Sequence, residues 1–171
     1  MRVEWAGKLI SAELASNGTF FLYSRHNKTH LGIRADSDEA PGLATKGLVS
    51  LSMGYREADN EPSFFDLAAL RGSRVYTLPD TCLVLPTERT HIHFASDNAN
   101  WGPGAVIVEN DQLYLVVAFN AGTRLFNLMD GKVQKDWPIT NGAVWYSAWS
   151  AVRRLGDESQ TVFEFKANLD R

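Results

Sequence analysis

Two histidines separated by a single residue, His91 and His93, have the spacing in this sequence that most directly suggests chemistry. On a β-strand, residues two apart point to the same face, and the strand rise places their imidazoles about 6.8 Å apart along the chain. Imidazole and carboxylate groups bind divalent transition metals such as Zn, Fe, Mn or Ni, and Asp97 follows four residues later. The spacing therefore predicts a metal site formed by His91, His93 and Asp97.

These residues continue to Gly104 in a pattern, His91-x-His93-x-x-x-Asp97-x6-Gly104, that resembles the first metal-binding motif of the cupin family. The resemblance implies a cupin-like metal-binding protein or a metal-dependent enzyme, in which His91, His93 and Asp97 hold the ion. An open coordination position on that metal would make the site catalytic.

The sequence also differs from the cupin pattern. Asp97 stands where the family usually has glutamate, and Leu85 stands where its motif opens with glycine. No histidine follows His93, so the family's second motif has no counterpart in this chain. His26 or His30, both upstream, would have to complete the metal shell, and we do not assign the chain to the family.

Ordinary strand alternation offers a second interpretation of the histidine pair. In this interpretation His91 and His93 face solvent while Ile92 and Phe94 face the core, which is the period-two pattern of a half-buried strand. No chemistry is then required of either imidazole.

A polar loop with one tryptophan follows the histidines. Its sequence, Asp97-Asn98-Ala99-Asn100-Trp101-Gly102-Pro103-Gly104, combines amide side chains with an indole. Amides can hydrogen-bond the hydroxyl groups of a sugar while the indole stacks against its ring. Asn98, Asn100 and Trp101 are therefore the predicted ligand-binding residues, although the same composition is also typical of a turn.

The charge balance and the single cysteine narrow the classes of function. Seventeen basic and twenty acidic side chains give a net charge of -3, which disfavours non-specific nucleic-acid binding. Cys82, as the single cysteine, has no partner for an intrachain disulfide. Neither a membrane-spanning apolar run nor the apolar segment of a signal peptide is found, so we expect a soluble, cytoplasmic protein.

Short apolar runs separated by turn residues predict two antiparallel meanders. In the first, Asn17-Gly18 is predicted to join strands at 9–14 and 20–23 in a type I′ hairpin. A third strand follows at 29–34.

The second meander occupies 104–135, where turn residues such as Asn110-Asp111 and Asp130-Gly131 separate the apolar runs. Its central strand, 113–119, is apolar on both alternating faces. We therefore expect this strand to be covered on both sides.

One short helix is predicted at 64–71. Ser63 and Asp66 have the spacing of a capping box, and Gly72 supplies a stop signal.

The segment 143–155 fits two structures. Its apolar residues recur at helical spacing ahead of Gly156, which favours a helix packed over the sheet. Its aromatic residues also fit a strand that pairs with 161–166 across the turn at Gly156, and this alternative stays open.

The sequence as a whole predicts a single mainly β domain over 1–171. We expect an antiparallel β-sandwich or barrel built from the two meanders, with one or two short helices. Because no complete catalytic set is found, the favoured function is non-enzymatic binding of a small molecule, a carbohydrate or a protein through the loop at 97–104. The alternative is the cupin-like metal-binding protein, and neither nucleic acid nor a membrane is an expected partner.

Overall fold

The structure is a computed structural model that describes residues 7–37, 46–52, 61–94, 101–119, 122–134 and 143–167. These residues form β-strands and short 3-10 turns, and no helix among them reaches seven residues. The strands pair mostly antiparallel, which confirms the mainly β fold class. None of the helical turns in these ranges is long and apolar enough to cross a membrane.

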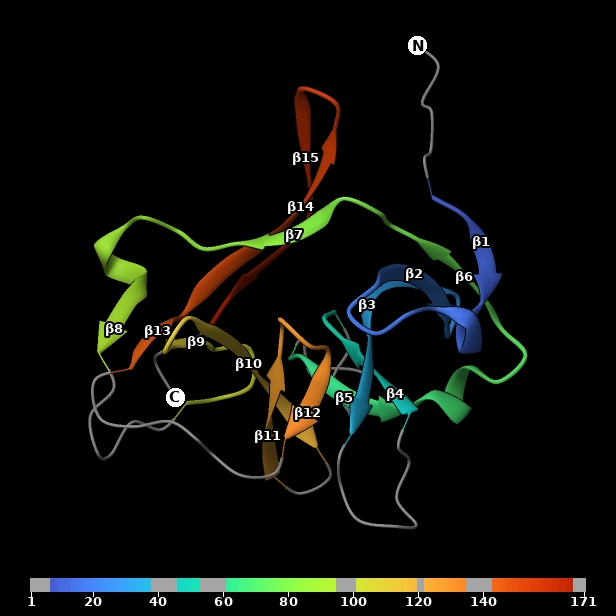
Figure 1. Cartoon of the computed structure of the whole chain (residues 1–171), viewed down its shortest axis with the longest axis horizontal. Helices are drawn as coiled ribbons and strands as arrows, with labels where there is room; N and C mark the ends of the chain where they lie inside the picture. The colour runs from blue at the N-terminus through green and yellow to red at the C-terminus, as the bar shows by residue number, and fades with distance from the viewer. Residues whose placement is uncertain are drawn as a thin grey trace.

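The larger of the two sheets contains strands from most of the chain (Figure 1). Its main path runs β1-β6-β2-β3-β12-β11-β10-β9-β13-β8, with β4 and β5 placed between β3 and β10. The strands of this sheet are β1 (Leu9–Ser11), β2 (Phe20–Arg25), β3 (Lys28–Ser37), β4 (Lys46–Ser50), β5 (Ser63–Asp66), β6 (Arg74–Thr77), β8 (Ile92–Phe94), β9 (Val106–Glu109), β10 (Gln112–Phe119), β11 (Gly122–Asn127), β12 (Lys132–Gln134) and β13 (Val144–Tyr146).

The pairings of this sheet include a closed circuit. From β3, one route leads through β4 and β5 to β10, and the other leads through β12 and β11 to β10. Two contacts in the circuit are parallel, with Val133 opposite Ser37 and Ala118 opposite Ser63. The two predicted meanders are therefore parts of one sheet, because β3 belongs to the first and β12 to the second.

The second meander is confirmed over β9 to β12. Asn110 and Asp111 adopt positive φ angles of 47° and 60°, as a type I′ hairpin between β9 and β10 requires. In the central strand β10, Val117 belongs to one core cluster and its neighbour Val116 to another. Both faces of β10 are therefore covered, as its apolar sequence predicts.

The first meander differs from the prediction at its first strand. β2 and β3 form the expected hairpin, but β1 pairs with β6, in the register that sets Leu9 opposite Tyr76. The predicted Asn17-Gly18 hairpin is therefore wrong. Gly18 does adopt a positive φ of 75°, yet its amide donates to the carbonyl of Arg34, so this turn extends the pairing of β2 with β3.

The helix predicted at 64–71 is wrong over its first half and is present only as a short 3-10 turn in its second half. The segment is the end of strand β5 followed by the 3-10 turn η2 (Leu67–Leu70). Asp66, rather than Ser63, caps this turn, and its carboxylate accepts a hydrogen bond from the amide of Ala68 at 2.7 Å. Phe64 is buried as expected, and aromatic side chains pack well on the pleated surface of a strand.

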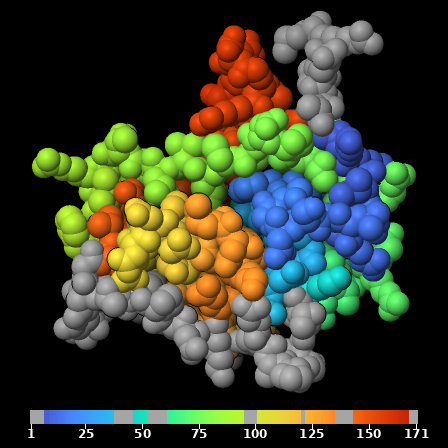
Figure 2. Space-filling view, in the orientation of Figure 1, coloured from blue at the N-terminus to red at the C-terminus, as the bar shows by residue number. Residues whose placement is uncertain are grey.

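The segment 143–155 consists of strands, so the helix favoured there is wrong and the alternative strand pairing is confirmed. It contains β13 and β14 (Ala148–Leu155), and β14 forms a three-stranded sheet with β15 (Glu158–Lys166) and β7 (Thr81–Val84). Trp149, Ala151 and Arg153 alternate along β14 and are buried, which is the period of a strand. Figures 1 and 2 show the tip of the β14–β15 hairpin projecting from the molecule.

The three-stranded sheet covers part of the main core. Trp149 and Ala151 of β14 belong to the same buried cluster as Ile33, Val117 and Phe126 of the large sheet. The inner face of β14 is therefore fixed by packing, which holds the start of β14 next to β13 and β8.

Candidate functional site

His91 and His93 meet at the hydroxyl group of Ser147. His91 ends the 3-10 turn η3 (Arg89–His91), His93 lies in β8, and Ser147 lies between β13 and β14. The Ser147 Oγ is 3.1 Å from Nε2 of His93 and 3.5 Å from Nδ1 of His91. The two predicted imidazoles therefore converge on one oxygen atom.

Backbone hydrogen bonds fix the position of this serine. The amide of Ser147 donates to the carbonyl of His91 at 3.1 Å, and the carbonyl of Ser147 accepts from the amide of Ala167 at 2.7 Å. Pairing of β8 with β13 sets His93 opposite Trp145. The site is therefore built where the large sheet passes into the three-stranded sheet.

The serine hydroxyl limits the combination of tautomers that the two rings can adopt. A hydroxyl group has one proton and two lone pairs. Ser147 can donate to only one imidazole, so the facing nitrogen of the other ring must carry a proton in order to donate to the serine oxygen. The tautomer of His91 is thereby linked to that of His93.

Each imidazole has a further neighbour. The ring of His93 stacks on the indole of Trp145, with centroids 4.2 Å apart and planes at 24°. The Nε2 of His91 lies 3.9 Å from Oε2 of Glu88, three residues earlier in the chain. Stacking on Trp145 orients the His93 ring, whereas the Glu88 carboxylate, whose side chain is 76% exposed, is a near neighbour of His91 without a hydrogen bond to it.

The serine, an imidazole and a carboxylate are the components of a nucleophile with its base, but the geometry opposes that role. Ser147 is only 1% exposed. Nucleophilic attack requires that a substrate reach the oxygen, and the buried Ser147 hydroxyl is shielded from such contact. The hydroxyl therefore serves as a bridge between the two rings.

A groove of about 600 Å³ lies beside His91. It runs between the β14–β15 pair and the segment that connects β7 to η3. The register of β14 with β15 sets Ser150 opposite Glu164 and Ala148 opposite Lys166, on one face of the three-stranded sheet. The ionisable residues of the groove are Glu88, His91, Glu164 and Lys166, and its apolar residues include Val84, Leu85 and Pro86.

Two aromatic residues of the groove contact the end of the predicted binding loop. The rings of Trp149 and Phe165 stack with centroids 5.3 Å apart and planes at 16°. The indole N–H of Trp149 donates to the carbonyl of Gly104 at 2.7 Å. A Cβ atom at Gly104 would lie 1.9 Å from the Phe165 ring, so only glycine fits there. The loop is thus attached to the groove at Gly104.

The other predicted loop residues are described only in part. Asp97, Asn98 and Asn100 lie outside the described residues. Trp101 is half-buried and packs against the core cluster that contains Ile107, against which Trp145 also packs. Trp101 and the indole under His93 thus share one cluster.

The exposure of Phe94 contradicts the interpretation in which residues 91–94 simply alternate between solvent and core. That interpretation placed Phe94 in the core, whereas its side chain is 77% exposed. His91 and His93 are half-buried and hydrogen-bonded rather than directed to solvent. Plain alternation fails because β8 ends the path of the large sheet, where a short strand has little to pack against.

His30 occupies a different part of the sheet. His30 lies in β3, which is separated from β8 in the large sheet by five strands: β12, β11, β10, β9 and β13. The ring of His30 lies 5.4 Å from that of Tyr23, and its Nδ1 is 3.4 Å from Oγ of Ser52. Within the described ranges, no group of three or more His, Cys, Asp or Glu side chains is placed to hold a metal ion.

Sequence reasoning missed Ser147, Trp145 and Glu88. Trp145 and Ser147 fall in the segment for which a helix was favoured, and their roles depend on pairing with β8. Once β13 is taken as a strand opposite β8, the cross-strand position of Trp145 beside His93 follows. Of these three residues, only Glu88 could have been linked to the site from the nearby sequence, because it precedes His91 by three residues.

Comparison with known proteins assigns no family to the chain. No protein-family model, no curated protein and no solved structure matches it.

Proposed function

We propose that this protein is a non-enzymatic binding domain whose ligand occupies the groove beside His91 and contacts the loop at 97–104. The observation that carries the proposal is the groove, whose volume of about 600 Å³ is in the range of small-molecule sites. Its walls combine apolar residues such as Leu85 and Pro86 with four ionisable ones, Glu88, His91, Glu164 and Lys166.

The polar groups of the groove suit a ligand rich in hydroxyl groups. The carboxylates of Glu88 and Glu164 accept hydrogen bonds, and the ammonium group of Lys166 donates them. Pro86 and Leu85 offer apolar surface to the carbon face of a ring. A carbohydrate is therefore the ligand class that we favour over a purely apolar molecule or a nucleic acid.

The attachment of the loop at Gly104 supports a role for Asn98, Asn100 and Trp101. Gly104, the last residue of the loop, is fixed against Trp149 and Phe165, which both line the groove. The amides of Asn98 and Asn100 would add hydrogen bonds to the sugar hydroxyls, and the half-buried indole of Trp101 would add ring contact.

A panel of mono- and oligosaccharides tests this proposal by titration under NMR. We expect saturable shifts of the amides of Glu164, Phe165 and Lys166 with at least one member of the panel. Glu164→Gln and His91→Ala should each weaken that binding roughly tenfold, because the first turns a charge-assisted hydrogen bond into a neutral one and the second removes a hydrogen-bonding ring from the wall of the groove. Glu158→Gln, an exposed change at the far end of β15, is the matched control and should leave binding unchanged. Unchanged affinity in both Glu164→Gln and His91→Ala would show that the ligand binds outside this groove.

The convergence of His91 and His93 favours a second candidate, a divalent transition-metal site of His91, His93 and Asp97. A carboxylate such as Glu88, near the other nitrogen of an imidazole, commonly orients a metal-ligating histidine. Elemental analysis of the purified protein tests this candidate. Near-stoichiometric metal that is lost in a His91→Ala/His93→Ala variant would support it, and no metal after reconstitution with Zn, Fe, Mn or Ni would exclude it.

A further inference from the structure

Arg153 in β14 is a buried cation whose paired partner is not among the described residues. Arg153 is only 3% exposed, and its Nε and Nη2 atoms have no hydrogen-bond partner in the described ranges. These two nitrogens form one edge of the guanidinium, and such an edge binds both oxygens of a carboxylate. Burial of a charge is costly unless an opposite charge and hydrogen bonds offset it.

Thr81 supplies a second buried donor on the strand that pairs with β14. It stands opposite Arg153 in the register of β7 with β14. Because the amide of Arg154 donates to the carbonyl of Asp80 at 2.9 Å, Arg153 and Thr81 form the neighbouring non-hydrogen-bonded pair. Side chains in such a pair are closest and share one face. The Oγ1 of Thr81 is also buried and without a hydrogen-bond partner among the described residues.

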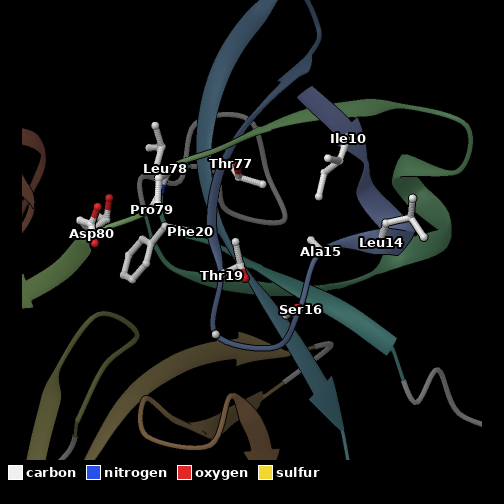
Figure 3. A pocket seen from close by; sticks show the side chains of 12 residues that line it. Ile10, Leu14, Ala15, Ser16, Thr19, Phe20, Thr77, Leu78, Pro79 and Asp80 are labelled. Carbon is white, nitrogen blue, oxygen red and sulfur yellow. The ribbon is translucent and has the colours of Figure 1, made fainter. Parts of the chain in front are cut away.

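Thr81 also lines a cavity of about 350 Å³. The cavity lies between β1, β2 and the link from β6 to β7, and its walls combine apolar side chains with polar ones such as Thr19, Thr77 and Asp80. Figure 3 shows Phe20 and Leu78 on one side and Ile10 and Leu14 on the other. A ligand that reaches Thr81 through this space would set an apolar body between these four side chains and an acceptor at its inner end.

We infer that Arg153 and Thr81 form the headgroup site for a small organic carboxylate, whose apolar body occupies the cavity that Thr81 lines. The carboxylate oxygens accept from Nε and Nη2 of Arg153, and one of them also accepts from the Thr81 hydroxyl. Arg153 lies toward the opposite end of β14 from Ala148, which lines the groove beside His91. The carboxylate site is therefore separate from the proposed carbohydrate groove.

Benzoate is a suitable probe, since it joins a planar carboxylate to an apolar ring, and benzamide is its neutral counterpart. Titration of the full chain, followed by NMR of the Arg153 Nε–H group and by thermal unfolding, should show saturable binding of benzoate. Benzamide at the same concentrations should produce neither effect. Inorganic phosphate tests whether any other oxyanion suffices, and tighter binding of phosphate than of benzoate would overturn the assignment to a carboxylate.

Three variants locate the binding. Arg153→Met should abolish the benzoate response, and the fold should survive because a buried charge is replaced by an apolar side chain of similar length. Thr81→Val should weaken binding roughly tenfold, since one hydrogen bond to a charged group is lost. Arg154→Met, an exposed change at the next residue, is the control and should bind as the parent does. No benzoate response in the parent, or an unchanged response in Arg153→Met, would overturn the inference.

Discussion

The indole of Trp149 and the carbonyl of Gly104 are joined by a 2.7 Å hydrogen bond that links the two sheets. Trp149 lies in β14 of the three-stranded sheet, while Gly104 precedes β9 of the large sheet. The amide of Gly104 donates in turn to the carbonyl of Val116 in β10, at 2.8 Å. Gly104 thus connects the central strand of the large sheet to the aromatic residues of the groove.

Gly104→Ala should destabilise the protein strongly. Its φ of 96° disfavours any other residue, and the added Cβ would clash with the ring of Phe165 at 1.9 Å. We expect a loss of about 3 kcal/mol or more in the free energy of unfolding, measured by denaturant titration. Gly156→Ala is the matched control, because Gly156 has a positive φ of 64° but open space around it. That control should lose only about 1 kcal/mol, and equal losses would show that the contact with Phe165 is unimportant.

Ser147→Ala should remove the link between the tautomers of His91 and His93. The change removes the hydroxyl that both half-buried rings contact and leaves a ring nitrogen without its partner, at a cost of about 1 kcal/mol in unfolding free energy. In the parent, NMR of the imidazole nitrogens should show that a change in the tautomer of His91 alters that of His93, and the variant should lose this coupling. Ser150→Ala, at a half-buried position in β14, should change neither property.

The elements that sequence reasoning predicted correctly are those whose signals are local. Asn110-Asp111 at a hairpin tip and the wholly apolar run in β10 each specify their structure within a few residues. The Asn17-Gly18 turn carried an equally strong local signal, yet the strands around it pair with other partners. A turn motif fixes the local backbone, and only the tertiary packing decides which strands lie side by side.

The candidate site illustrates the same limit. His91 and His93 were identified from their spacing, and the structure does bring them together. The residue that joins them, Ser147, is more than fifty positions away and lay in a segment whose apolar spacing fitted a helix. Trp149, Ala151 and Arg153 match a strand only once the hairpin with β15 is known, since helical and strand periods overlap over so short a run.

Val116→Ala and Val117→Ala should cost similar amounts of stability. The two side chains point to opposite faces of β10, and both are fully buried, in different core clusters. Each change removes two buried methyl groups and leaves a small cavity, so we expect a loss of about 2 kcal/mol for each in denaturant unfolding. A cost confined to one of the two variants would show that only one face of β10 is packed.

The pH dependence of stability should reveal the buried phenol of Tyr23. Burial is the main cause that raises the pKa of Tyr23 above its ordinary value of 10.0, and it outweighs the opposing effects of the Ser50 hydrogen bond and the Arg25 charge. The folded state therefore favours the neutral phenol more than the unfolded state does. Its contribution to stability is fully present below pH 10.0 and is lost as the pH rises through the raised pKa of the folded state.

Tyr23→Phe tests this assignment, since it removes the titrating group from the same buried position. The variant should lose about 1 kcal/mol at neutral pH, because the 2.8 Å hydrogen bond from the Tyr23 hydroxyl to Ser50 Oγ is lost. Above pH 10.0 its stability should fall less steeply than that of the parent, as measured by denaturant unfolding at a series of pH values. Tyr114, whose pKa is also raised by burial and by the charges of Glu109 and Asp130, accounts for part of the remaining slope. A Tyr23→Phe/Tyr114→Phe variant should therefore be flatter still, and identical slopes in all three proteins would show that neither phenol is linked to folding.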